Sequence, residues 1–112
     1  MNPIASTPAP PYFAVLFTSV KSSINDPEYA AMAARMAELA AQQPGYLGME
    51  HAGNPDGSAI TISYWTSLEA IRNWRQHAEH LHAQRLGRAK WYERYALRVC
   101  RVERADDFTF GQ

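Results

Sequence analysis

The chain has 112 residues, of which 46% are hydrophobic and 20% charged, and its eleven basic side chains balance eleven acidic ones. This length corresponds to one small globular domain, and the zero net charge argues against binding of nucleic acid or of a membrane surface by the whole protein. The single cysteine, Cys100, excludes an internal disulfide, and we expect a cytoplasmic protein because no signal peptide or membrane-spanning run is present in the sequence.

The predicted elements begin after a proline-rich arm. Residues 1–11 carry four prolines and little that can pack, so we expect a flexible or extended arm there and a single domain over residues 12–112. Residues 12–20, YFAVLFTSV, are aromatic and β-branched, which is typical of a short strand.

A helix and a hairpin are predicted next. Asp26 is a good N-cap and Pro27 fits the first helical position, while the Pro-Gly pair at 44–45 ends the helix. Residues 46–53 and 58–65 both alternate between apolar and polar side chains around an NPDG turn, so they predict a β-hairpin.

A second helical region follows the hairpin. Thr66 and Glu69 form a capping box, which predicts that the helix begins there. Its buried stripe is expected at apolar positions three or four residues apart, namely Leu68, Ile71, Trp74, Ala78 and Leu81. The helical pattern weakens over 80–87 and resumes near Arg88, so we expect a bend or break there. Residues 96–104, ALRVCRVER, form the last predicted strand.

This β-α-β-β-α-β order predicts an α+β, ferredoxin-like sandwich. Two helices cover only one face of such a sheet, yet the first strand is apolar on both faces, with Phe13, Val15 and Phe17 on one and Ala14 and Leu16 on the other. A second apolar face needs a cover, and the same face of another subunit supplies it most simply. We therefore expect a homodimer.

The histidines offer few metal-binding patterns. His77, His80 and His82 do not converge on an unbroken helix, so we expect no metal site. His77 lies one turn after Trp74, where it is either a packed, hydrogen-bonded side chain or a proton shuttle in a pocket. His80 and His82 are expected at the surface or at an interface.

Aromatic residues crowd the second helical region. They include Tyr64, Trp65, Trp74 and Trp91, which either pack as core or line a cleft for a planar aromatic ligand. Seven Lys or Arg residues but only two acids lie between Arg85 and Arg104. That run is either a solvated face or, through Arg88, a means of stabilising an anionic substrate. The strands carry no RNP-type motif, which argues against RNA binding.

Three segments carry a family resemblance: QPGYLGME, SYWTSLEAIRNWRQHAEHLHAQRLGRAKWYERY and RVCRVER. Together they resemble the antibiotic biosynthesis monooxygenase (ABM) family over nearly the whole domain, from Tyr12 to Phe110. The resemblance implies a dimeric α/β barrel, in which two ferredoxin-like subunits join sheet to sheet. Some members oxidise polyphenolic aromatics with dioxygen and without a cofactor, and a tryptophan matched by Trp65 lines their pocket.

The expected function is therefore a cofactor-independent monooxygenase acting on a small aromatic or quinol-like compound. Trp65, Trp74, Trp91 and Tyr64 would bind the ring, His77 would handle a proton and Arg88 would favour the anion. One alternative is a haem-degrading member of the superfamily, although the place of its axial histidine falls near Gln84 and the first strand has no asparagine. The other alternative is a non-catalytic protein that binds small molecules or serves in stress.

Overall fold

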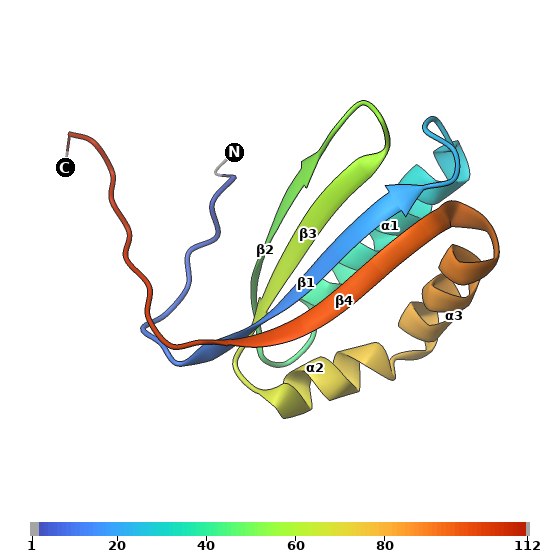
Figure 1. Cartoon of the computed structure of the whole chain (residues 1–112). Helices are drawn as coiled ribbons and strands as arrows, with labels where there is room; N and C mark the ends of the chain where they lie inside the picture. Colours follow the sequence, from blue (N-terminus) through green and yellow to red (C-terminus); the bar gives the residue numbers. More distant parts are fainter. Residues whose placement is uncertain (1–2, 112) are drawn as a thin grey trace.

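The computed structural model describes residues 3–111 and confirms the ferredoxin-like α+β arrangement. Its elements in chain order are β1 (Tyr12–Lys21), α1 (Pro27–Ala41), β2 (Tyr46–Gly53), β3 (Ser58–Trp65), α2 (Leu68–Arg75), α3 (Ala78–Leu86), a π-helical turn η1 (Gly87–Trp91) and β4 (Tyr92–Val102). The four strands form one antiparallel sheet in the order β2-β3-β1-β4 (Figure 1). The hairpin spans the residues predicted for it, and Asp26 caps α1 by accepting hydrogen bonds from the backbone of Glu28 and Tyr29.

The second helical region differs from the prediction at both ends. Ser67, not Thr66, is the N-cap, and its hydroxyl oxygen accepts a hydrogen bond from the backbone N–H of Ala70. The break lies earlier than expected, at Gln76 and His77, because α2 stops there and α3 starts at a new angle (Figure 1). After α3 the chain makes the π-helical turn η1 and enters β4 at Tyr92, four residues before the predicted start of that strand.

The predicted buried stripe holds only in part. Ile71 and Trp74 are buried, whereas Leu68 and Leu81 are 50% and 38% exposed. The helix break explains the exposure of Leu81, since α3 does not continue the face that α2 turns toward the sheet. Leu68 is the first residue of α2, so its exposure does not depend on the break. The side chain of Ala78 lies outside the described part of the structure.

The side chains of the strands point to two faces of the sheet, one covered by helices and one not. Strand register places Val15 opposite Ser63 and Val99, and Ser63 opposite Met49, so these residues share one face. The helices pack on this helix-covered face, where α1 and α2 supply its core partners. Leu16 and its neighbours in register, among them Ile62, lie on the helix-free face.

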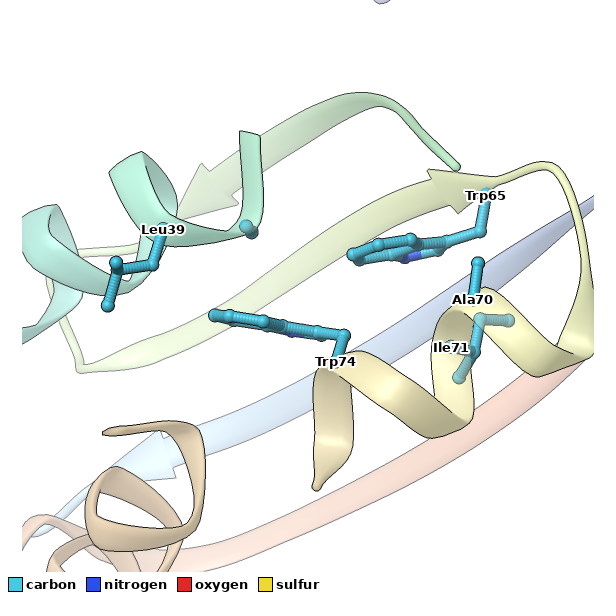
Figure 2. Packing of buried hydrophobic residues seen from close by; sticks show 6 residues of the cluster. Leu39, Trp65, Ala70, Ile71 and Trp74 are labelled. Atoms are coloured by element: carbon cyan, nitrogen blue, oxygen red, sulfur yellow. The ribbon is translucent and has the colours of Figure 1, made fainter. Parts of the chain in front are cut away.

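The core on the helix-covered face is built around one indole (Figure 2). Trp65 is fully buried at the end of β3, and its ring stacks on that of Trp74 from α2 with 6.3 Å between centroids. Leu39 of α1 and Ile71 of α2 close the cluster from either side. This packing fixes α2 and the C-terminal part of α1 at the end of the sheet where β3 stops, and the rest of α1, α3 and η1 lie over the remainder of the helix-covered face.

The N-terminal arm is extended, and it packs against the sheet. The Ala5 N–H donates to Glu50 Oε2 at 3.1 Å, and the Thr7 hydroxyl donates to the hydroxyl of Tyr12 at 2.9 Å. A Cβ added at Gly48 would lie 2.9 Å from the Cβ of Ala5, so the arm runs directly over that glycine. The arm thus covers part of the helix-free face, while the C-terminal tail leaves from the same end of the sheet (Figure 1).

Candidate functional site

A cavity of about 420 Å³ lies between the helix-covered face of the sheet and the three segments α1, α3 and η1. Its walls come from every strand and from α1, α2, α3 and η1. The side chains that line it are Val15, Phe17, Tyr29, Met32, Ala33, Met36, Ala37, Ala40, Met49, His51, Thr61, Ser63, Ile71, Trp74, Arg75, His80, Ala83, Gln84, Gly87, Arg88, Trp91, Tyr92, Tyr95 and Leu97. A cavity of this volume, lined mainly by apolar and aromatic groups, fits a small planar molecule.

One end of the cavity is aromatic. The rings of Phe17 and Tyr95 lie 5.2 Å apart, and the ring of Tyr29 meets those of Trp91 and Tyr92 edge to face at 5.8 Å. Tyr92 donates its hydroxyl proton to the hydroxyl oxygen of Tyr29, and burial followed by this hydrogen bond raises the pKa of Tyr92. Tyr92 therefore stays neutral at physiological pH, and this end of the cavity presents ring surface together with the Tyr92 hydroxyl.

The charges around the cavity have one sign. Arg75 and Arg88 both line it, and no carboxylate is found among its lining residues within 3–111. The Nε–H of Arg88 donates to the hydroxyl of Tyr95 at 3.0 Å, which leaves the two terminal nitrogens of the guanidinium for another partner. Because opposite charge is absent from the lining, an anion gains more than a cation from entering this cavity.

The break between α2 and α3 places a polar side chain, that of His80, against the carbonyl oxygen of Trp74. Trp74 is near the end of α2, so its carbonyl oxygen accepts no i→i+4 hydrogen bond within that helix. The backbone N–H of His77 and the Nδ1 of His80 both lie 3.0 Å from that oxygen. The imidazole of His80 also stacks on the indole of Trp74, with 4.5 Å between centroids and 22° between planes. His80 is thereby held against the cavity wall by two contacts.

The electrostatic surroundings of His80 favour its neutral form. Burial lowers its pKa most, the hydrogen bond to Trp74 partly opposes this, and electrostatic interactions with Arg75 and His77 lower the pKa further. The ring is consequently uncharged at neutral pH. A carbonyl oxygen accepts only, so the nitrogen beside it, Nδ1, carries the proton.

The residues predicted for the site do not all meet in the cavity. Trp74, Trp91 and Arg88 line it. Trp65 lies behind Trp74 in the core and Tyr64 lies on the helix-free face, where its hydroxyl donates to Glu50 Oε1 at 2.6 Å. The remaining candidate, His77, does not line the cavity either.

His80, rather than His77, lines the cavity. His77 begins α3 with its ring 5.8 Å from that of Trp74, and its Nδ1 is buried without a hydrogen-bond partner among residues 3–111. His80, predicted at the surface or at an interface, is half-buried and lines the cavity. The sequence predicted a bend or break only over 80–87, later than the observed one, and no glycine or proline marks the break that turns His80 inward.

The structure also bears on metal and haem ligands and on membrane-spanning helices. Within residues 3–111, no three His, Cys, Asp or Glu side chains gather as ligands for a metal ion. Gln84, which stands where the haem-degrading proteins carry their axial histidine, lines the cavity but offers an amide, which is not among the usual axial ligands of haem. No helix in the described part of the chain is both long and apolar enough to cross a membrane.

Comparisons with known proteins agree on the kind of fold. The model of the family described as antibiotic biosynthesis monooxygenase matches residues 14–86. The uncharacterized protein YqjZ of Bacillus subtilis is 53% identical over 104 residues, which cover 93% of this chain and 90% of that protein.

Two solved structures share the fold at low sequence identity. SnoaB of Streptomyces nogalater, a cofactor-independent oxygenase, superposes with a TM-score of 0.69 at 18% identity over 92% of this chain and all of that one. A protein of Shewanella oneidensis gives a TM-score of 0.72 at 7% identity, covering 82% of this chain and 91% of the other. At these identities the likeness shows the fold alone.

Proposed function

The chain belongs to the antibiotic biosynthesis monooxygenase family, and from that premise we propose that it is a cofactor-independent monooxygenase of a small, electron-rich aromatic compound. The proposal rests above all on one observation: the cavity combines an aromatic, methionine-rich lining with two arginines and no carboxylate among its described lining residues. That combination favours a planar aromatic molecule which carries negative charge during the reaction.

The chemistry needs only a substrate that is acidic and easily oxidised. Loss of a proton from a ring-activated CH₂ group leaves a carbanion, which gives electrons to dioxygen. Overall, CH₂ and O₂ become C=O and H₂O, so that dioxygen takes up four electrons, one oxygen atom enters the product and the other leaves as water. The protein has to bind the ring, favour the anion and exclude bulk water.

The described residues divide these tasks. Trp74 and Trp91 line the cavity and would hold the substrate ring, with Trp65 supporting Trp74 from behind. Arg88, fixed by Tyr95, would stabilise the negative charge through its terminal nitrogens. Packing of His77 against Trp74 supports the same wall from outside the cavity.

Oxygen uptake tests the proposal directly. With anthrones or hydroquinones added to the purified, metal-free protein, an oxygen electrode should record uptake that depends on enzyme concentration. For an anthrone, one O₂ should disappear for each quinone formed. Tight ligand binding without oxygen uptake would instead favour a non-catalytic binding protein, and a Soret shift on addition of stoichiometric haem would favour the haem-degrading alternative.

The location of the substrate can be tested on α1. Ala33 lines the cavity and its neighbour Ala34 does not. We expect Ala33→Trp to fill part of the cavity and lower kcat/KM for the best substrate about tenfold or more, equivalent to at least ~1.4 kcal/mol of lost transition-state binding. Ala34→Trp adds the same indole to the same helix and should leave kcat/KM within about twofold. Equal effects of the two changes would place the substrate elsewhere.

We further propose that the protein works as a homodimer whose subunits join through their helix-free faces. In a single chain this face leaves apolar side chains without a helical cover, with Ile60 48% exposed and Leu16 and Ile62 half-buried. An apolar sheet face of this kind is typical of a surface buried in an assembly. The arm over Gly48 covers only part of it.

A charge at the centre of that face should separate the subunits. We expect wild-type protein to sediment as a dimer and Leu16→Glu to sediment as a monomer at micromolar concentration, because an unpaired carboxylate in an apolar interface costs several kcal/mol. Ile24→Glu is the control, since Ile24 is 54% exposed and lies outside the sheet. A monomeric wild-type protein in analytical ultracentrifugation would contradict the dimer.

A further inference from the structure

The cavity contains a histidine whose protonated nitrogen is fixed by the fold. In His80 that nitrogen is Nδ1, because its partner is the carbonyl oxygen of Trp74. His51 also lines the cavity, but its Nδ1 lies 2.8 Å from the hydroxyl of Thr61, which can donate or accept. Only for His80, of these two, does the geometry decide which nitrogen is left with a lone pair.

We propose that His80 is the base that removes the proton from the substrate, acting through its Nε2 atom. This assignment rests on the proposed function, and it names the group that makes the oxidisable anion. It also replaces the role that the sequence predicted for His77. The proton passes from the substrate to Nε2, and the electron pair that held it stays on the substrate.

The Nε2 atom meets the requirements for this role. It has no hydrogen-bond partner among residues 3–111, and it is not one of the buried side-chain nitrogens that are sealed from solvent. It belongs to a side chain that lines the cavity, so a substrate in the cavity can approach it. The lowered pKa of His80 keeps this nitrogen unprotonated at neutral pH.

The groups around His80 suit the anion that results. Arg75 on α2 and His77 at the start of α3 act electrostatically on His80. Arg88 on η1 and His51 on β2 line the same cavity, and within 3–111 no carboxylate does. After proton transfer the imidazolium and the arginines stabilise the new negative charge. The nearest acid in sequence, Glu79, is held by Arg35 of α1 through two contacts of 3.2 and 3.3 Å on the protein surface.

The tautomer can be measured without any substrate. In ¹⁵N-edited NMR spectra of wild-type protein, His80 should show a protonated Nδ1 and an unprotonated Nε2 at pH 7. As the pH falls, Nε2 should gain its proton below the ordinary histidine value of about 6.5. A proton on Nε2 at pH 7, or a titration above 7, would overturn the assignment whatever the ligand turns out to be.

Proton transfer can be followed apart from oxidation. Under argon, anthrone mixed with wild-type protein in a stopped-flow instrument should develop the long-wavelength band of its anion, and the rate at which the band appears should rise with pH through the titration of His80. In His80→Asn the side-chain amide can still donate to the Trp74 carbonyl, but no base remains. That variant should bind anthrone yet form the anion at least about a hundredfold more slowly at pH 7, in line with the loss of a positioned base.

His82→Asn is the matched control, because His82 is exposed on the same helix, and it should behave as wild type. Anion formation in His80→Asn at the wild-type rate, or a wild-type complex in which no anion band appears, would overturn the role of His80. Since dioxygen is absent from this experiment, an anion that forms under argon but is not oxidised in air would instead count against the monooxygenase. The two failures are therefore distinguishable.

Discussion

Replacing Trp65 with alanine is expected to destabilise the folded chain by about 3–5 kcal/mol, the usual range for a large aromatic side chain removed from a core. The indole has no exposed surface and stacks on Trp74. It also meets the ring of Tyr46 edge to face at 5.5 Å, and its Nε1–H donates to the hydroxyl of Ser63 at 2.9 Å. Truncation therefore leaves a void where α1, α2 and β3 meet, and urea denaturation followed by circular dichroism measures the cost.

The control for this change is Leu68→Ala. Leu68 begins α2 close to Trp65 in sequence, but its side chain is 50% exposed. Its loss should lower the free energy of unfolding by no more than about 0.5–1 kcal/mol. Similar costs for the two substitutions would show that Trp65 is not the centre of the core.

A second large effect is expected at Gly45, where the chain turns from α1 into β2. Its φ of +86° disfavours any residue with a Cβ, and an added Cβ would lie 2.6 Å from the Cβ of Ala70 and 2.7 Å from the hydroxyl oxygen of Thr66. The backbone term costs about 1–2 kcal/mol and the overlap about 1–3 more. We therefore expect Gly45→Ala to lower the free energy of unfolding by about 2–5 kcal/mol in the same denaturation measurement.

Substitution of Gly57 separates the cost of the backbone conformation from the cost of the steric overlap. Its φ is +93°, close to that of Gly45, but the nearest atoms to an added Cβ lie 3.7–3.8 Å away, which is ordinary contact. Gly57→Ala should thus cost only the backbone term of about 1–2 kcal/mol. If it proved as costly as Gly45→Ala, the close approach between the turn at Gly45 and α2 would be wrong.

Local signals in the sequence predicted most of the fold. Alternation fixed both strands of the hairpin, and the Asp26–Pro27 pair marked the start of α1. The predictions that were wrong concern positions where contacts between distant parts of the chain determine the local structure. Thr66 looks like a cap, yet its hydroxyl lies close to the space above Gly45 and its N–H bonds to the Gly45 carbonyl, so Ser67 takes the role.

The candidate site was harder to predict because it depends on the junction between α2 and α3. Aromatic composition indicated a ring-lined cavity, and Trp74, Trp91 and Arg88 do line one. Which of His77 and His80 lines the cavity depends on a helix break at Gln76 and His77, and neither of these residue types normally ends a helix. Because α2 ends there, the carbonyl oxygen of Trp74 accepts a hydrogen bond from Nδ1 of His80 in addition to the one from the His77 N–H, a contact that periodicity in the sequence does not predict.

Because side chains alternate along β1, this one strand contributes both to the cavity on the helix-covered face and to the helix-free face. Val15 lines the cavity, while Leu16, the next residue, belongs to the opposite surface. A point substitution in β1 can therefore change the cavity lining while the helix-free face keeps its shape, or the reverse. A single-residue deletion within β1 would do the reverse, because every side chain beyond it would change sides at once. Laboratory evolution of this chain should accordingly accept exchanges along β1 far more readily than insertions or deletions.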